Sequence, residues 1–429
     1  MFHGRRVLPI LFVAALVLQT AATIGAILFL DLPISTEIDS VEYIHTADNV
    51  LAGRGFSIED APPFRANAFR TPGPLILNIP LRLLSFRNDI AAALISRLVL
   101  LLAAYVCALN AAQMGLNKLA LLAGSLFILT PNMFYYSMLA YSTELPYSLA
   151  CGVLQLGTFL YLSKANRTGA ILIGLSAMYA LLLRPAALFV LIAYVGICAI
   201  CTIATQGALR RRIVIAAAVC LVATSVAYAA WSFRNYFVFD TFQFSTVSAD
   251  NLLRWNAQGM EPFLDAQGRQ ELRESLKKHP ITLQRYSGAD QFVIADQEDK
   301  EGLRLILKYP VAFLQSHLRG VLESALTFRP SALESRGRAP VIVMSAAHLG
   351  FLALGTLGLL LLYRAMGAGQ WAALLIIVGV GAISLLSGGS THSPRFRIPL
   401  DIPLVIGTVN CIAWVRSPRG DPTDARGRP

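Results

Sequence analysis

Long apolar stretches recur along most of this chain and constrain its fold more than any other feature. A helix that crosses a bilayer needs roughly 20 consecutive, mostly apolar residues. Ten segments approach that length, near residues 7–30, 90–113, 118–137, 144–163, 168–184, 186–204, 213–231, 341–363, 371–388 and 398–416. The pattern therefore predicts an all-α polytopic membrane protein with about ten transmembrane helices.

The composition agrees with this class of protein. Of the 429 residues, 55% are hydrophobic and only 14% are charged, whereas soluble domains average about 25% charged residues. The first apolar segment, from Val7 to Leu30, is too long for the core of a signal peptide, and no small-residue cleavage pattern follows it. We therefore expect this segment to be retained as a transmembrane helix.

The distribution of positive charge indicates how the chain is oriented. The net charge is +11, from 36 basic and 25 acidic residues, and much of the positive charge lies at the ends of apolar segments, on alternate connections. Cytoplasmic connections are enriched in Lys and Arg, so we expect both termini in the cytoplasm. Membrane orientation explains the charge, and no nucleic-acid partner is expected.

Two long polar segments then fall on the outer side of the membrane, at residues 31–89 and 232–340. In the second segment, apolar residues recur at helical spacing on either side of Pro310, which predicts a helix that lies along the membrane surface. These residues are Leu303, Leu307, Val311, Leu314, Leu318 and Leu322. The tail at 417–429 is rich in Arg, Gly, Pro and Asp and is expected to be disordered.

Asp39 begins a helix-like run in the first outer segment. Tyr43 follows one helical turn later and shares a face with Asp39, and Gly53 and Gly55 end the run. A carboxylate at the membrane edge can accept a proton from a substrate hydroxyl once partial burial raises its pKa. The alternative is that Asp39 only caps the helix.

Arginines lie at several non-cytoplasmic span ends, where the usual charge bias does not explain them. Arg65 and Arg70 follow Asp39, and the proline-rich turn Arg70-Thr71-Pro72-Gly73-Pro74 would fix the direction of Arg70. A guanidinium matches phosphate oxygens with a planar fork of donors, whereas single interfacial arginines often only snorkel to the surface. Five arginines at such positions indicate one shared anionic ligand. They are Arg70, Arg184, Arg234, Arg395 and Arg397; Asn235 follows Arg234, and Glu144 begins another span on the same side, where it could also only cap the helix.

Metal chemistry has little support in the sequence. The six cysteines all lie in apolar stretches, which predicts buried packing residues, and Cys198 and Cys201 lack partners for a zinc site. Asp39, Glu42 and His45 form the one group able to approach a divalent ion. We expect no cofactor and no essential metal.

The motifs, taken together, resemble the GT-C class of membrane glycosyltransferases, and within it the protein-mannosyltransferase and aminoarabinose-transferase superfamily. The resemblance extends over most of the chain. It rests on Asp39-x-x-x-Tyr43, Gly53-x-Gly55, Arg70-Thr71-Pro72-Gly73-Pro74, Ser142-Thr143-Glu144, Leu183-Arg184-Pro185, Trp231-x-x-Arg234-Asn235-Tyr236 and Arg395-Phe396-Arg397-Ile398-Pro399-Leu400.

The resemblance implies a GT-C-like domain over residues 1–416 in a bacterial inner membrane, with its site on the periplasmic or extracellular side. Such enzymes transfer a sugar from a polyprenyl-phosphate carrier to a hydroxyl of a glycan, lipid or protein, usually with inversion. Asp39 matches the catalytic base. The substrate-binding residues would be Tyr43, Arg65, Arg70, Glu144, Arg184, Arg234, Asn235, Arg395 and Arg397.

Two features depart from the family pattern, and two other functions stay open. Ser40 stands where protein mannosyltransferases have a second adjacent acid, and the chain ends soon after its last span. A transporter or flippase of lipid-linked sugars is the main alternative, although transporters usually gather their polar groups near the middle of the membrane. A non-catalytic assembly factor is the other alternative.

Overall fold

The computed structural model describes residues 4–30, 38–280, 287–327, 338–363, 366–391 and 393–416. All regular elements within these ranges are helices, which confirms the predicted all-α class. The tail predicted to be disordered, and residues 31–37 and 328–337 of the two outer segments, lie outside the described residues.

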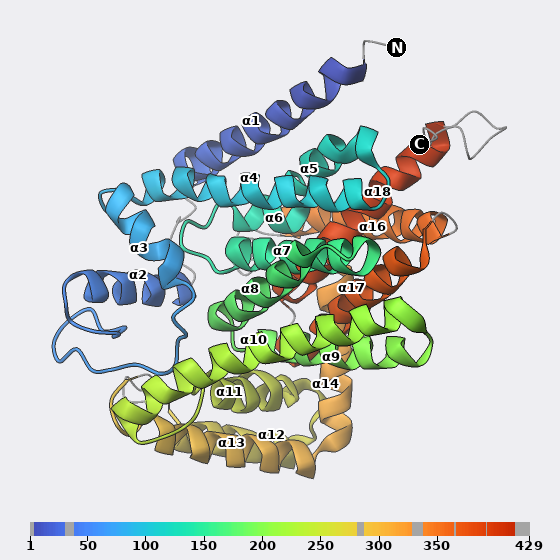
Figure 1. Ribbon diagram of the computed structural model, residues 1–429. Helices are drawn as coiled ribbons and strands as arrows, with labels where there is room; N and C mark the ends of the chain where they lie inside the picture. Colours follow the sequence, from blue (N-terminus) through green and yellow to red (C-terminus); the bar gives the residue numbers. More distant parts are fainter. Residues whose placement is uncertain are drawn as a thin grey trace.

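Seven of the described helices are long and apolar enough to cross a membrane. They are α1 (Gly4–Leu30), α4 (Asp89–Gln113), α7 (Glu144–Lys164), α10 (Gly207–Phe239), α16 (Arg338–Tyr363), α17 (Ala368–Ser387) and α18 (Ile398–Arg416). The start of α1 and the end of α18 lie at the same end of this bundle, and α2 (Ile38–Leu51) and α3 (Leu75–Leu84) lie at the other (Figure 1).

Three of the ten predicted spans correspond to shorter apolar helices. Predicted span 118–137 is divided into α5 (Ala120–Ile128) and α6 (Pro131–Tyr136), because Thr130 caps a new helix that starts with Pro131. Helices α8 (Arg167–Leu183) and α9 (Ala187–Ile203) have 17 residues each, or about 25 Å. Arg184 adopts an extended conformation before Pro185 and so separates them. The total of ten spans stays a prediction.

Helix α10 is longer than its predicted span of 213–231. Its 33 residues extend about 50 Å, whereas the hydrocarbon core of a bilayer is about 30 Å thick. At least one end of this helix therefore projects beyond the apolar layer.

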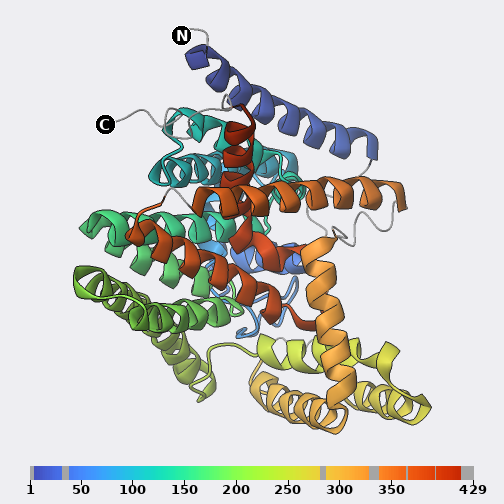
Figure 2. The ribbon, with the colours of Figure 1, turned by 90° about the vertical axis from the view of Figure 1, so that its right-hand side faces the viewer.

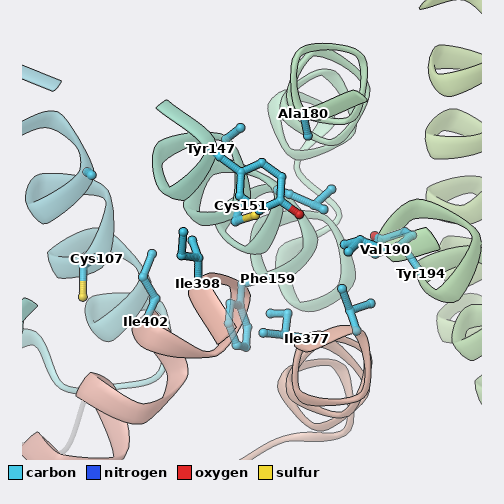
Figure 3. Close-up of a cluster of buried hydrophobic side chains, with 14 of the residues drawn as sticks. Cys107, Tyr147, Cys151, Phe159, Ala180, Val190, Tyr194, Ile377, Ile398 and Ile402 are labelled. Carbon is cyan, nitrogen blue, oxygen red and sulfur yellow. The ribbon is translucent and has the colours of Figure 1, made fainter. Parts of the chain in front are cut away.

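The spanning helices pack through small residues and a continuous apolar core. A side chain at Gly358 of α16 would collide with the backbone of Gly407 in α18, so glycine permits the close approach of these two helices. Figure 3 shows Tyr147 and Cys151 of α7 near Ile377 of α17 and Ile398 of α18 within the buried core. All six cysteines are buried, as the sequence predicted, and none of them forms a disulfide.

The second outer segment forms a layer of helices beside the bundle (Figures 1 and 2). Its helices are α11 (Val247–Asp250), the π-helix at Asn251–Ala257, α12 (Ala266–Lys278), α13 (Gln291–Lys308) and α14 (Pro310–Leu326). They enclose a small apolar core of their own, which includes Leu253, Leu272 and Leu305. The sequence predicted one helix through Pro310, but two helices occupy this region: α13 ends at Lys308, and Pro310 begins α14, because proline favours the first turn of a helix.

Helix α14 runs across the spanning helices instead of along them (Figure 2). One face packs on the turn at 389–391 between α17 and α18, where Gly320 approaches the backbone of Gly389. The other face is exposed and apolar, with Val311, Leu314 and Leu318 each more than half exposed.

Candidate functional site

Four charged side chains meet where α2 faces the start of α18. Arg70 Nη2 donates to Asp39 Oδ1 at 2.5 Å, and Arg70 Nε donates to Glu42 Oε2. Arg395 Nη1 lies 3.3 Å from Asp39 Oδ2. We call Asp39, Glu42, Arg70 and Arg395 the charged cluster. The cluster joins the first outer segment to the start of the last span, which lies far away along the chain.

The segment before Arg70 is held by the second outer segment. Ala68 N donates to the side chain of Gln291 at 2.8 Å, and Ser245 Oγ donates to the carbonyl of Phe69 at 2.8 Å. Arg70 N in turn donates to Asn67 Oδ1 at 2.9 Å. These bonds bring the two predicted outer segments together and fix the backbone that carries Arg70.

The turn after Arg70 docks on the end of α8. Gly73 N donates to the carbonyl of Leu182 at 2.9 Å, and any side chain at Gly73 would collide with the backbone of Leu182 and Leu183. Glycine is therefore required by close approach at this position. The contact places the Arg70 turn next to Arg184, which directly follows α8.

Arg184 and Glu144 form a second ion pair beside the charged cluster. Glu144 starts α7 and is buried, and its Oε1 lies 3.3 Å from Arg184 Nη1. The Arg184 guanidinium lies over the ring of Tyr147, 5.4 Å from the centroid. Tyr43 is also buried, with Arg70 over its ring at 5.3 Å. The charge of Arg184 thus acts on Asp39 together with those of Arg70 and Arg395.

Asp39 and Glu42, the two acids of the charged cluster, experience opposite pKa shifts. Burial opposes ionisation of Asp39, but the charges of Arg70, Arg395 and Arg184 outweigh it and hold the Asp39 pKa below its ordinary value. For Glu42, burial outweighs the attraction of Arg70, so the Glu42 pKa is raised. Burial also raises the pKa of Tyr43 to about 12. Near neutral pH, Asp39 is therefore ionised and Tyr43 keeps its proton.

Arg234 and Asn235 have other partners. Arg234 lies over the rings of Phe56, Trp231 and Phe239, at 5.3, 4.8 and 5.2 Å from their centroids, and donates to the carbonyl of Asn67. Asn235 is fully buried and donates to the carbonyls of residues 243 and 244. Both residues fix the backbone around the charged cluster, and within the described part of the chain their hydrogen bonds do not reach Asp39.

Arg65 and Arg397 also lie in separate networks. Arg65 pairs with buried Glu59 at 2.7 Å, and Ser287 donates to the same carboxylate. Arg397 is 2% exposed and donates to the carbonyls of Ser324 and Thr327 at 2.9 and 2.7 Å. The structure thus brings together only some of the predicted site residues, namely Asp39, Tyr43, Arg70, Glu144, Arg184 and Arg395.

Two acids near Asp39, namely Glu42 and Asp250, are not among the predicted site residues. Glu42 stands three residues after Asp39 on α2, a spacing that places both on one helix face, so this signal was present. Asp250 comes from α11 and acts on Glu42 through its charge. The sequence around Asp250 does not indicate that this residue lies near α2. Only the folded chain shows this proximity.

No group of three or more His, Cys, Asp or Glu with metal-binding geometry occurs in the ranges that the structure describes. Asp39 and Glu42 instead share Arg70 as their cation. A groove of about 560 Å³ lies elsewhere, lined by apolar residues of α1, α4 and α5, including Phe12, Leu101 and Tyr105.

The charged cluster combines fixed cations with carboxylates at a partly exposed position. The exposed fractions of the Asp39 and Arg395 side chains are 36% and 26%. Guanidinium groups in this setting can bind a phosphate, and a carboxylate can accept a proton. No protein-family model matches the chain, and no curated protein matches it either.

Proposed function

We propose that the protein is an integral membrane glycosyltransferase of the GT-C type. It transfers a sugar from a polyprenyl-phosphate carrier to a hydroxyl of a glycan, lipid or protein, with inversion. The observation that carries this proposal is the meeting of Arg70 and Arg395 across Asp39. Two non-titrating cations and adjacent carboxylates are the groups that this displacement needs.

The division of roles follows from the chemistry. The phosphate of the donor is anionic before transfer and gains charge as the glycosidic bond breaks, so Arg70 and Arg395 stabilise it in both states. Arg184 adds positive charge nearby. A carboxylate of α2 accepts the proton of the acceptor hydroxyl, a role that the family resemblance gives to Asp39.

The proposal includes a membrane orientation. About ten helices cross a bacterial inner membrane, both termini are cytoplasmic, and the charged cluster faces the periplasmic or extracellular side. The exposed face of α14 then lies against the outer leaflet, because this helix runs across the spans and its apolar face has no partner among the described residues.

Cysteine accessibility tests this orientation. The six native cysteines are buried and give little background. Asp60 and Ala266 are exposed in the outer segments, and Gln206 is exposed in the α9–α10 connection. Asp60→Cys and Ala266→Cys should react with an impermeant maleimide in intact cells, and Gln206→Cys only after permeabilisation. The reverse pattern would place the charged cluster on the wrong face.

Transfer is tested with purified protein in nanodiscs and a panel of polyprenyl-monophosphate sugars. Release of polyprenyl phosphate is the readout, since it does not depend on knowing the acceptor. We expect release from at least one donor, and its loss in Arg70→Ala. Binding and translocation of a donor in proteoliposomes without release would identify a flippase instead. Absence of both binding and release would refute the proposal.

A further inference from the structure

Asp39 and Glu42, the two α2 carboxylates in the charged cluster, differ in how their oxygens are engaged. Arg70 and Arg395 contact one oxygen each of Asp39, at 2.5 and 3.3 Å. Both oxygens of this carboxylate are therefore engaged by guanidinium groups. A proton acceptor must present an oxygen to the substrate hydroxyl within hydrogen-bond reach. Each oxygen keeps a second lone pair, but a proton on either one would weaken an ion pair with a cation that holds the phosphate.

Glu42 has an oxygen that is not engaged in this way. Its Oε2 accepts from Arg70 Nε, and its Oε1 has no hydrogen bond or ion pair within the described part of the chain. The Glu42 side chain is 15% exposed, so this oxygen is largely sheltered from bulk water yet accessible at one edge. Its position on the same helix face as Asp39 keeps it within the charged cluster.

Burial is the main cause that favours proton uptake by Glu42; two neighbouring acids add to it, and Arg70 opposes it. Arg70 faces it from the first outer segment, Asp39 from its own helix and Asp250 from α11. Asp250 is itself paired with Arg254 at 3.4 Å. Burial, together with these two acids, raises the Glu42 pKa while the Asp39 pKa is lowered. Neighbouring carboxylates with pKa values that diverge in this way have different roles in acid–base sites.

We infer that Glu42 is the proton acceptor of this site and that Asp39 is a positioning residue that fixes Arg70 and Arg395. The inference rests on the proposed transferase function and refines it. Glu42 takes the proton from the acceptor hydroxyl as the oxygen of that hydroxyl forms a bond to the anomeric carbon. The bond between that carbon and the phosphate oxygen breaks, and its electron pair leaves with polyprenyl phosphate. Water then removes the proton from Glu42.

Infrared difference spectroscopy tests the proton acceptor without any substrate. Protein in nanodiscs is titrated from pH 7 to acid pH, and the band of protonated carboxylic acid is followed. We expect a component of this band that is absent from Glu42→Gln and retained in Asp39→Asn. The matched control is Asp48→Asn, which removes another α2 carboxylate that pairs with Arg82 at 2.8 Å. Loss of the component in Asp39→Asn instead would overturn the inference.

Kinetics with the donor identified in the release assay provide the second test. Glu42→Gln should lower turnover by about 100-fold or more and abolish the acid limb of the pH profile. Asp39→Asn should retain that limb, lower turnover by only about 10-fold and change donor affinity, because the guanidinium groups lose their anchor. Glu42→Asp should restore the acid limb in part.

The outcomes separate this inference from the proposed function. If wild-type protein binds polyprenyl phosphate and releases it from a donor, but Asp39→Asn is the variant that loses the acid limb, the transferase stands and Glu42 is not the acceptor. If the infrared component depends on Glu42 but polyprenyl phosphate neither binds nor is released, the transferase proposal fails while the proton-binding role of Glu42 stands.

Discussion

Arg395 and Arg397 are two residues apart, yet they serve different regions of the molecule. Arg395 reaches Asp39 in the charged cluster, and 26% of its side chain is exposed. Arg397 is buried, donates to the carbonyls of Ser324 and Thr327, and contacts Asn132 at 3.1 Å. The turn at Pro394–Arg397 directs the two side chains to different surroundings.

The two regions also use their acids differently. In the charged cluster, Asp39 and Arg395 are in direct contact at a partly exposed position. In the Arg397 network, Asn132 stands between the cation and buried Asp401, to which its amide donates at 2.8 and 3.1 Å. The ion pair at the exposed edge leaves part of the Arg395 guanidinium accessible. The hydrogen bonds of Arg397 to backbone carbonyls instead tie the end of α14 to α18. The same residue types therefore form a partly exposed ion pair in one region and a buried connection between helices in the other.

The largest expected effect is on stability, from Arg397→Met. This change keeps an apolar stem but leaves buried acceptors without a donor, so we expect a loss of about 3–5 kcal/mol. Thermal unfolding in detergent, followed by intrinsic fluorescence, measures it. Arg395→Met is the matched control and should change stability by less than about 1 kcal/mol, because its ion pair is partly exposed. Equal losses in the two variants would remove the distinction between the regions.

Arg70→Ala should have the next largest effect, on ligand affinity. Hydrogen bonds to charged groups contribute about 1.5–3 kcal/mol, so binding of polyprenyl phosphate should weaken by about 100-fold. Quantitative native mass spectrometry or thermophoresis in nanodiscs measures the affinity. Arg82→Ala is the control, since Arg82 pairs with Asp48 at the other end of α2. Retained affinity in Arg70→Ala would separate the charged cluster from phosphate binding.

Local sequence signals predicted much of the fold. Helix α2 begins at Ile38 and ends near the glycines at 53 and 55, both of which have positive φ values. The predicted break at Arg184-Pro185 follows from what proline does to the backbone. The break before Pro310 has the same cause, but the continuous helical spacing there predicted a single helix. The Thr130-Pro131 start of α6 carried the same kind of signal, although hydrophobicity alone made residues 118–137 read as one span.

The candidate site was harder to predict because its contacts are long-range. Asp39, Tyr43 and Arg70 are close in sequence, and their association follows from one helix face and one stiff turn. Arg234 is different, since its partners Phe56 and Asn67 lie far away along the chain. A motif can place a side chain at the end of a helix, but tertiary packing decides whether it meets a ligand, an aromatic ring or a carbonyl.

Glu42→Gln should change how stability depends on pH. The pKa of Glu42 is raised in the folded state, so its contribution to stability is present below its ordinary pKa of 4.5 and is lost as pH rises through the folded value. The variant should therefore melt at a higher temperature than wild type at pH 7, and the difference should shrink toward pH 4.5.

Asp39→Asn is the comparison for this experiment. The pKa of Asp39 is lowered, so its contribution is present above its ordinary value of 3.8 and is lost only as pH falls further. This variant should melt at a lower temperature than wild type throughout the range from pH 7 to pH 4.5. If both variants shifted in the same direction at pH 7, the two carboxylates would not have the opposite environments described here.

The smallest expected effect comes from an exposed ion-pair network in the outer layer. Arg304 on α13 contacts Glu271 and Glu301 at 2.7 Å, but 45% of its side chain is exposed. Water screens such pairs and ordering the side chains costs entropy, so Arg304→Ala should destabilise the protein by about 0.5 kcal/mol or less. Thermal unfolding at low and high salt measures the effect, which should disappear at high salt. A loss as large as that in Arg397→Met would mean that burial does not decide the energetic role of an arginine in this protein.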